Sequence, residues 1–274
     1  EIKRRNITSI LISALFRPSQ AYFKFYGGWL KNLLFTFDHI FTQDTNSKVL
    51  LNSIGYRAVT VSGDTRFDRV GDQLKIDNTL DFIAEFKNNQ ICVVAGSTWP
   101  EDETLLIDYI NSSKEETKFI IAPHNMDLNQ IKSVVKQLKK PTVLYSNYTT
   151  ETLKDKRVFI IDTIGLLSKI YSYANIAYIG GGMGTSGLHN TLEAATFGLP
   201  IVIGKNYQKF PEAKAMLFSG GLFSISDFES LESTLNMLIN DSQKRTESGQ
   251  KNKDYIEGNK GASELVMSEL KTLF

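Results

Sequence analysis

A glycine-rich run follows the apolar segment ANIAYI and has the composition of an anion-binding loop. It reads GGGMGTSGLHNT at residues 180–191, and Gly182, Gly184 and Gly187 form the pattern G-x-G-x-x-G. Glycines allow close backbone approach, and the free N–H groups at the start of a following helix attract phosphate. A dinucleotide site would place this loop after the first strand of its domain and an acidic residue at the end of the next strand. Here several strand-like runs precede the loop, and the next one, PIVIGKNYQ, ends without an acid, so NAD and FAD are disfavoured.

Two polar side chains follow the loop at a spacing that permits two interpretations. Asn190 and Glu193 lie three residues apart in the run HNTLE. This is the spacing of a capping box, in which both side chains bond backbone N–H groups at a helix start. The Glu193 carboxylate could equally accept hydrogen bonds from the ribose hydroxyls of a nucleotide, as an acid does in dinucleotide sites. The residues alone leave both interpretations open. Gly198 is predicted to end the short helix and Pro200 to begin the next strand.

Three further loops follow predicted strands and carry polar residues. Ser97 and Thr98 lie in AGSTWPEDE, where they could contact phosphate or cap the helix that Pro100 begins. His124 lies in APHNMD, and the run DTIG occupies residues 162–165. The carboxyl ends of parallel strands meet at one edge of a sheet, where α/β folds bind their ligands. Four loops at that edge predict a nucleotide site.

Composition and motif content exclude several other classes of protein. The 274 residues contain 31 Lys and Arg against 30 Asp and Glu, so no overall field favours nucleic acid. The three histidines, at 39, 124 and 189, are scattered, and no H-E-x-x-H pair suggests a zinc site. Neither a G-x-S-x-G elbow nor a P-loop is present. The single cysteine, Cys92, lies in the apolar run QICVVAG and is predicted to be an inert core thiol.

The order of elements predicts an α/β fold, because strand-like runs alternate with amphipathic segments nearly throughout. Ten strands are predicted, at residues 7–15, 39–42, 58–62, 90–95, 118–122, 142–145, 158–162, 176–179, 200–203 and 221–224. Three of them precede the polar stretch 64–89 and seven follow it, which indicates one partial domain and one complete doubly wound domain. Residues 241–274 have a charged helical pattern.

The N-terminal segment combines aromatic and basic residues. Six basic residues against two acidic ones precede His39, and the run SQAYFKFYGGWLKNLLFTF is crowded with aromatic side chains. Such a segment could lie at a membrane interface. It could equally be a helix packed within its own domain. No uncharged apolar run approaches the roughly 18 residues that span a bilayer, and no signal-peptide pattern is present.

Taken together, these segments resemble the 3-deoxy-D-manno-octulosonic acid (Kdo) transferases, glycosyltransferases of lipopolysaccharide assembly in Gram-negative bacteria. The resemblance covers essentially the whole chain. It rests on SGDTRFD at 62–68, VVAGSTWPEDE at 93–103, IIAPHNMD at 120–127, DTIGLLSKIYSYANIAYIGGG at 162–182 and, most specifically, GLHNTLEAATFGLPIVIG at 187–204. It implies the two-domain GT-B fold, with a remnant of the N-terminal acceptor domain at 1–66 and a Rossmann-like CMP-sugar-binding domain at 67–258. A C-terminal helix at 259–274 could cross back to the N-terminal domain.

The resemblance implies inverting, metal-independent transfer of Kdo from CMP-Kdo to a lipid A precursor at the cytoplasmic face of the inner membrane. It implies no cofactor and no nucleic-acid partner. The family's general base, a Glu in an N-terminal glycine-containing motif, has no counterpart in this sequence. We therefore expect a soluble piece of a longer protein, which binds at most the CMP moiety and does not transfer sugar by itself.

The resemblance assigns the family's site residues to the matching positions of this sequence. Arg66 stands where the family has a Lys thought to stabilise the transition state, His124 replaces an Arg, and Leu166 replaces a Glu. Glu193 is expected on the ribose. The residues expected to bind the CMP-sugar are Ser97, Thr98, Pro123, His124, Ile164, Gly165, Leu166, Gly181, Gly182, Asn190, Thr191, Leu192 and Glu193.

Two alternatives belong to other classes. One is a different GT-B enzyme that uses a UDP-sugar, or a related epimerase, because uridine and cytidine differ only at one base edge. The other is a non-enzymatic nucleotide-binding Rossmann module in which Asn190 and Glu193 merely cap a helix.

Overall fold

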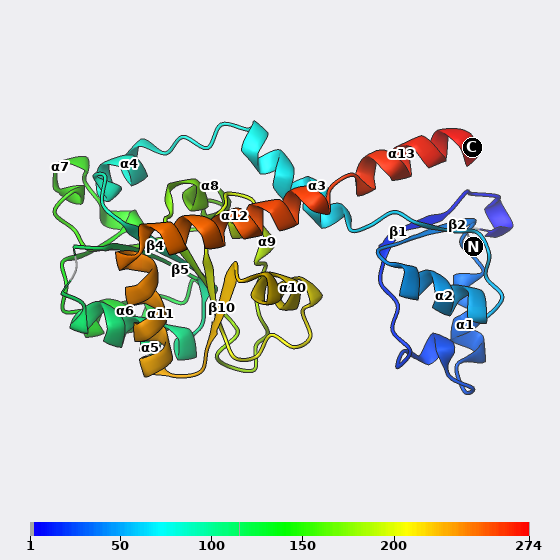
Figure 1. Ribbon diagram of the computed structural model, residues 1–274, viewed down its shortest axis with the longest axis horizontal. Coiled ribbons are helices and arrows are strands. Elements are labelled where there is room, and N and C mark those ends of the chain that lie inside the picture. Colours follow the sequence, from blue (N-terminus) through cyan, green and yellow to red (C-terminus); the bar gives the residue numbers. More distant parts are fainter. Residues whose placement is uncertain (1–2, 115, 274) are drawn as a thin grey trace. The chain divides into compact units, whose positions relative to one another are not determined.

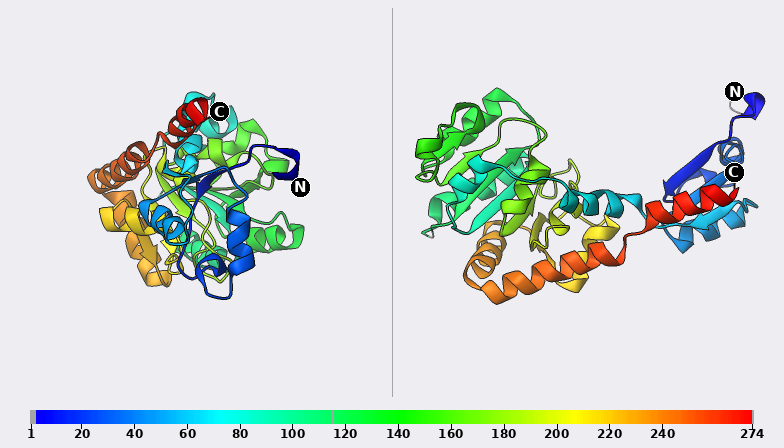
Figure 2. Two further views of the ribbon diagram at one scale, coloured as in Figure 1. Left: turned by 90° about the vertical axis from the view of Figure 1, so that its right-hand side faces the viewer. Right: turned by 90° about the horizontal axis from the view of Figure 1, so that it is seen from above.

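The computed structural model describes residues 3–114 and 116–273, and the chain divides into two compact units (Figure 1). The small unit comprises residues 1–71 and 257–274, and the large unit comprises residues 72–256. Figure 2 gives two further views of the same elements. Each unit has its own parallel sheet.

The small unit is built on a three-stranded parallel sheet in the order β1-β2-β3. Its core contains Ile40 and Leu51, both fully buried. The Asp44 carboxylate caps α2 by accepting a hydrogen bond from the Ser47 N–H at 2.6 Å. Its elements are η1 (Lys3–Arg5), β1 (Ile10–Ala14), η2 (Ala21–Phe23), α1 (Gly28–Leu34), β2 (His39–Thr42), α2 (Thr45–Ser53), β3 (Val59–Val61), α3 (Thr65–Asp72) and α13 (Ala262–Leu273).

The C-terminal helix α13 is tied to α3 within the small unit. The Asp68 carboxylate accepts hydrogen bonds from the N–H groups of Gly261, at 2.6 Å, and Ser263, at 2.7 Å. Burial alone would raise the pKa of Asp68, but these two bonds outweigh it and hold the pKa below its usual value. Residues 257–274 are therefore part of the small unit, although they are far from its other residues in the sequence.

The large unit contains a seven-stranded parallel sheet in the order β10-β9-β8-β4-β5-β7-β6. Its strands are β4 (Cys92–Thr98), β5 (Lys118–Pro123), β6 (Thr142–Leu144), β7 (Val158–Ile160), β8 (Ile176–Ile179), β9 (Ile201–Gly204) and β10 (Leu222–Ile225). Its helices are α4 (Asp81–Lys87), α5 (Pro100–Ser112), α6 (Leu128–Gln137), α7 (Thr150–Leu153), α8 (Leu167–Ile170), α9 (Leu192–Ala195), α10 (Pro211–Ser219), α11 (Phe228–Asn240) and α12 (Ser242–Gly258). Three 3-10 turns complete it, at η3 (Gln73–Lys75), η4 (Tyr145–Asn147) and η5 (Tyr171–Tyr173).

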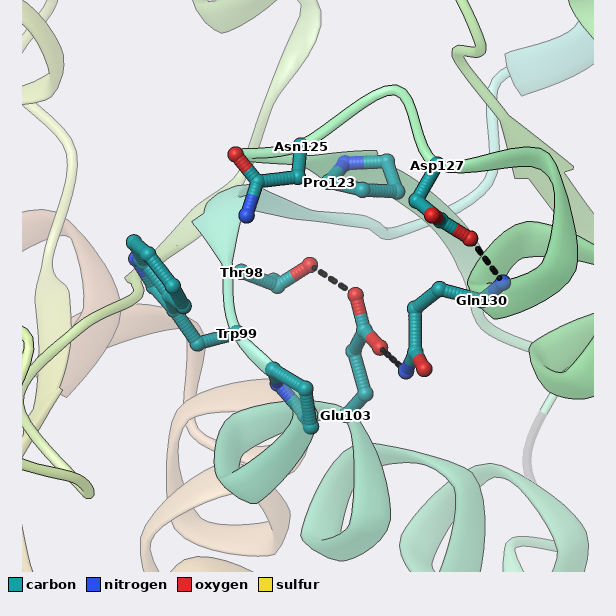
Figure 3. Close-up of a pocket in the computed structure, with 8 residues that line it drawn as sticks. Thr98, Trp99, Glu103, Pro123, Asn125, Asp127 and Gln130 are labelled. Carbon is teal, nitrogen blue, oxygen red and sulfur yellow. Dashed lines mark hydrogen bonds between the residues drawn. The ribbon is translucent and has the colours of Figure 1, made fainter.

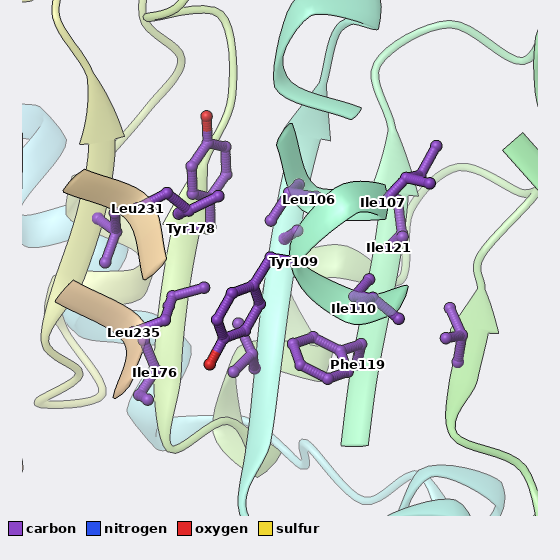
Figure 4. Close-up of a cluster of buried hydrophobic side chains, with 14 of the residues drawn as sticks. Leu106, Ile107, Tyr109, Ile110, Phe119, Ile121, Ile176, Tyr178, Leu231 and Leu235 are labelled. Atoms are coloured by element: carbon purple, nitrogen blue, oxygen red, sulfur yellow. The ribbon is translucent and has the colours of Figure 1, made fainter. Parts of the chain in front are cut away.

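Successive side chains of each strand point to opposite faces of the large sheet. Both faces therefore carry apolar side chains, and helices cover both. Val93 and Ala95 of β4 belong to the buried cluster that α5, α6 and α11 cover (Figure 4). Gly96 faces the other side, where a Cβ atom would lie 2.0 Å from the Tyr171 hydroxyl oxygen. A side chain at Gly96 would therefore push η5 away from the sheet. Apolar burial on both faces explains the continuous apolar runs in the sequence.

The ten predicted strands and the α/β fold class are confirmed. The largest difference in the large unit is at β4, which continues to Thr98 instead of ending at Ala95. Its pairing with β5 shifts between Gly96 and Thr98, where Ser97 has a φ of 55°. The predicted helical segment 241–274 forms α12 and α13, separated near Gly261; Phe274 lies outside the described residues.

The strand order places the loops after β4 and β8 at a topological switch point. These strands are neighbours at the centre of the sheet, and β5 and β9 lie on their respective outer sides. Ligands of open α/β sheets bind in the crevice at the carboxyl ends of two such strands. Among the described residues, no helix is long and apolar enough to cross a membrane.

Candidate functional site

The glycine loop after β8 passes so close to other backbone segments that its first residues must be glycine. A Cβ atom on Gly180 would lie 2.2 Å from the Ser97 carbonyl oxygen, and one on Gly181 would lie 2.1 Å from the Gly187 carbonyl oxygen. Gly181 also has a φ of 87°, which side chains disfavour. The loop is thus closed on itself and pressed against the end of β4.

Asp102 anchors this loop from the first turn of α5. The side chain is fully buried and accepts hydrogen bonds from the Gly181 N–H at 2.8 Å, the Trp99 N–H at 3.0 Å and the Tyr178 hydroxyl at 2.8 Å. Burial, and then the neighbouring carboxylate, raise the pKa of Tyr178 well above its usual value, so it remains a donor. Sequence reasoning missed Asp102, because an acid in a PEDE run is typical of any helix start.

The tip of the glycine loop offers unpaired backbone donors. Within the described chain, the N–H groups of Met183, Gly184, Thr185 and Ser186 have no hydrogen-bond acceptor. The loop's carbonyl groups are held by Asn206, whose N–H donates to Gly182 O at 2.9 Å and whose side-chain amide donates to Gly184 O at 2.7 Å. A loop with fixed carbonyls and free N–H groups is suited to bind an anion.

Asn190 and Glu193 lie side by side, but they do not form a reciprocal capping box. The Asn190 side-chain amide donates to Glu193 Oε1 at 2.9 Å, and Asn190 Oδ1 accepts from the Leu192 N–H at 3.1 Å. Glu193 Oε2 has no partner among residues 3–114 and 116–273. The Thr191 hydroxyl beside them is buried and also without a partner in that part of the chain. Asn190 therefore both supports the helix start and orients a carboxylate with unused acceptor capacity.

Three aromatic rings from three different loops form a stack that the sequence did not reveal. The Trp99 ring stacks on His124 with centroids 4.9 Å apart, and the rings of His124 and His189 lie 4.3 Å apart. The Trp99 indole N–H donates to His189 Nε2 at 2.9 Å. His124 and His189 are far apart in the sequence, but the fold brings them together because the ends of β5 and β8 lie at the same edge. His39 lies in the small unit.

The hydrogen bond from Trp99 requires a neutral His189 whose proton is on Nδ1, because Nε2 must accept. Burial lowers the pKa of His189, and His124 nearby lowers it further, while Asp102 opposes the change. The ring is therefore held in its neutral form at neutral pH. No group of three or more possible metal ligands occurs in the residues that the structure describes.

A small cavity of about 170 Å³ lies beside this stack between the ends of β4 and β5 (Figure 3). The buried Glu103 carboxylate points into it and accepts hydrogen bonds from the Thr98 hydroxyl at 3.0 Å and the Gln130 amide at 2.6 Å. The Thr98 hydroxyl is therefore engaged within the protein. The Ser97 hydroxyl, in contrast, has no partner within the described residues. Neither side chain caps α5, whose N-cap residue is Trp99.

The remaining predicted site residues are Pro123, the segment 164–166 and Arg66, and Pro123 lines the cavity beside the stack. Pro123 is buried at the end of β5. Ile164, Gly165 and Leu166 form an exposed loop after β7, and the Ile164 side chain is 80% exposed. Arg66 lies in the small unit, where its guanidinium bonds the Asp64 carboxylate at 2.8 Å. The large unit thus brings together Gly181, Gly182 and the residues 190–193 with the ends of β4 and β5.

The fold and this edge define a pair of parallel α/β units of the GT-B type. Solved structures that match parts or most of this fold include the C-terminal CMP-Kdo binding domain of WaaA from Acinetobacter baumannii. That domain is 18% identical with a TM-score of 0.53, and the match covers 64% of this chain and 97% of that one. Another is the UDP complex of Anabaena Alr3699/HepE, which is 14% identical with a TM-score of 0.58; the match covers 99% of this chain and 73% of that one. The GT-B fold class is confirmed.

The sequence relatives are more specific. Residues 1–69 match the family model described as 3-Deoxy-D-manno-octulosonic-acid transferase (kdotransferase). The 3-deoxy-D-manno-octulosonic acid transferase of Rickettsia typhi is 28% identical over 225 residues, which cover 77% of this chain and 48% of the relative. The predicted relationship to the Kdo transferases is confirmed. The chain spans about half the length of that relative.

Proposed function

We propose that the large unit binds CMP-Kdo and that the whole protein transfers Kdo from it to a lipid A precursor. The observation that carries the proposal is the Asn190–Glu193 pair beside the glycine loop at the switch point of the sheet. One Glu193 oxygen is bonded by Asn190, and the other has no partner in the described chain. A carboxylate held this way can accept two hydrogen bonds from neighbouring ribose hydroxyls.

The other residues at the edge take complementary roles in this proposal. The free N–H groups of the glycine loop tip receive the nucleotide phosphate, which leaves with the electron pair of the bond to the sugar. Ser97 offers a free hydroxyl to the same phosphate. His124 stands where the resembled family has an Arg, and its ring stacks on Trp99. It therefore contributes packing and hydrogen bonds to the site and not the fixed charge of a guanidinium. The nucleotide base lies against the backbone of Ile164, Gly165 and Leu166.

Arg66 is proposed to offset negative charge that develops on the departing phosphate. Asp64 holds its guanidinium through both Nε and Nη2, each 2.8 Å from the same carboxylate oxygen. This pairing orients the side chain and also neutralises part of its charge. We therefore assign Arg66 a smaller electrostatic contribution than an unpaired cation would make.

We propose the small unit as part of the acceptor domain and the inner-membrane surface as the place where the whole protein works. The Phe25, Tyr26 and Trp29 side chains are 99%, 63% and 69% exposed, next to Lys24 and Lys31. Exposed aromatic rings flanked by lysines suit the headgroup region of an anionic membrane. In the alternative of a helix packed within its own domain, these rings would be buried by other residues of the unit.

The experiment is a calorimetric titration of the chain with CMP, using UMP and NAD as control ligands. We expect selective CMP binding that falls about tenfold or more in Glu193→Gln, because the neutral amide loses charge-assisted bonds to the ribose. Glu193 is partly exposed, so thermal unfolding of the variant should be close to that of the wild type.

The outcomes separate the candidate functions. Tighter binding of UMP than of CMP would favour a UDP-sugar enzyme and overturn the proposal. Equal CMP affinity in Glu193→Gln, with lowered stability, would mean that the residue only supports the helix. A spectral or calorimetric response to NAD alone would reopen the dinucleotide interpretation.

A further inference from the structure

A second and larger cavity lies at the glycine loop and shares no lining residue with the cavity at Glu103. Its volume is about 320 Å³, at the lower end of the range of roughly 300–1,000 Å³ for small-molecule sites. It is formed between the tip of the glycine loop and the segment that joins β9 to α10. Its lining includes Gly184, Thr185, Asn206, Gln208, Lys209 and Phe210.

Lys209 gives this cavity its charge. It is the one basic residue that lines the cavity, and in the described chain its ammonium group has no ion-pair or hydrogen-bond partner. Gly184 and Thr185, whose N–H groups are unpaired in the described chain, line the same cavity. A free cation beside free N–H groups is an arrangement that favours a carboxylate or phosphate.

The amide side chains of the cavity are already oriented, and their oxygens remain available. Asn206 uses its nitrogen to bond Gly184 O at 2.7 Å, and Gln208 uses its nitrogen to bond Lys205 O at 2.9 Å. Their oxygens, which accept no hydrogen bond within the described residues, suit hydroxyl groups. Phe210 closes the cavity: its ring tip lies 3.9 Å from where a Cβ atom on Gly187 would stand.

Two side chains of opposite charge, Glu101 and Lys209, lie near the tip of the glycine loop. The Glu101 carboxylate lies on the glycine loop as well, with an oxygen 2.8 Å from where a Cβ atom on Gly184 would stand. Glu101 does not line the cavity. A negatively charged group near Glu101 would be repelled, whereas one near Lys209 is attracted.

We propose that this cavity binds the sugar of the donor and that Lys209 recognises its carboxylate. The inference rests on the proposed function, because it takes a CMP-linked sugar acid as the donor. The phosphate lies on the loop's free N–H groups, so the sugar attached to it reaches the cavity directly beyond the loop tip. Asn206 and Gln208 accept hydrogen bonds from sugar hydroxyls, and Lys209 strengthens the binding of a donor whose sugar carries an acid group.

The test compares two lysine variants and three ligands by calorimetric titration of the full chain. The variants are Lys209→Gln and Lys205→Gln, which remove the same charge from the same segment; Lys205 is exposed and does not line the cavity. The ligands are CMP, freshly prepared CMP-Kdo and the methyl ester of CMP-Kdo. We expect Lys209→Gln to bind CMP and the ester as the wild type does, within about twofold, and CMP-Kdo about tenfold or more weakly. Lys205→Gln should bind all three as the wild type does.

Each other result overturns the inference in a recognisable way. Equal weakening of CMP and CMP-Kdo in Lys209→Gln would place the nucleotide phosphate, and not the sugar acid, on Lys209. Unchanged CMP-Kdo binding in Lys209→Gln would exclude Lys209 from the sugar site. If the wild type bound no CMP at all, the proposed function itself would fail, whereas CMP binding with no response at Lys209 would leave it intact.

Discussion

The carboxyl edges of the two sheets share a backbone distortion and use it differently. In each unit the first strand carries an irregularity near its end, and in each a serine there has a positive φ, 56° at Ser13 of β1 and 55° at Ser97 of β4. In the small unit, Ser13 Oγ lies 3.3 Å from each of three partners: Asp64 Oδ1, the Thr65 N–H and the Gln43 amide. In the large unit, the Ser97 hydroxyl bonds nothing in the described chain.

The difference shows how one local geometry can either close an edge or leave it open for a ligand. Buried or half-buried polar groups normally find partners within the protein, so a group of unpaired donors is informative. In the small unit, the Asp64 carboxylate accepts hydrogen bonds from both Ser13 and Arg66. The large unit leaves Ser97, the glycine loop tip and one oxygen of Glu193 without partners among the described residues. The open edge is where we expect the nucleotide.

The largest effect should come from Asp102→Asn, which disturbs the anchor of the open edge. The new amide nitrogen would either face the N–H groups of Trp99 and Gly181 or displace the acceptor of the Tyr178 hydroxyl. A fully buried donor facing another donor has no water to replace the lost bond. We expect a loss of about 3 kcal/mol in the free energy of unfolding of the large unit, measured by denaturant titration. A loss under about 1 kcal/mol would show that the loop does not depend on Asp102.

The matching change in the closed edge, Asp64→Asn, should have a smaller effect. Asp64 is 7% exposed, but the Arg66 side chain that it pairs with is 44% exposed, so water can replace part of the interaction. We expect a loss of about 1 kcal/mol, read from the unfolding of the small unit. An effect as large as that of Asp102→Asn would contradict the view that the two edges differ.

Much of the fold could be predicted because the strands of both sheets are short apolar runs between polar loops. The runs FIIA and IVIG were recognisable because strands buried on both faces show no alternation. The glycine loop and the pair Asn190 and Glu193 could be predicted as a site from their spacing. The stack of Trp99, His124 and His189 could not, because the three residues belong to different loops and only the parallel pairing of β5, β4 and β8 brings them together. Ser97 could not be expected at a positive φ, which glycine and asparagine adopt more readily.

The open edge should also respond to acid through His189. Folding lowers the pKa of His189 from its ordinary value of 6.5, so the folded state favours the neutral ring. As the pH falls below about 6.5, the unfolded state therefore binds more protons than the folded state. The contribution of His189 to stability is present above that pH and is lost as the pH falls through the pKa of the folded state. Trp99→Phe removes the indole donor to Nε2 and should raise the pKa of His189. An NMR titration of the imidazole signals would measure it, and a pKa unchanged or lowered in this variant would exclude the hydrogen bond as a contributor.

A similarly small but more discriminating effect should come from replacing each of the two distorted serines by glycine. A positive φ costs a residue with a side chain about 1 kcal/mol, and replacement by glycine removes this cost. In Ser97→Gly no hydrogen bond within the described chain is lost, so we expect a gain of up to about 1 kcal/mol, a rise of about 2–4 °C in melting temperature. Ser13→Gly loses the Oγ contacts with Asp64, Thr65 and Gln43, which should outweigh the relief and lower stability by about 1 kcal/mol.

If Ser97 contributes its hydroxyl to the nucleotide phosphate, Ser97→Gly should bind CMP more weakly even as it melts later. A variant that melts later with unchanged CMP affinity would leave Ser97 as backbone strain without a role in binding, and would confine the open edge to the glycine loop and Glu193.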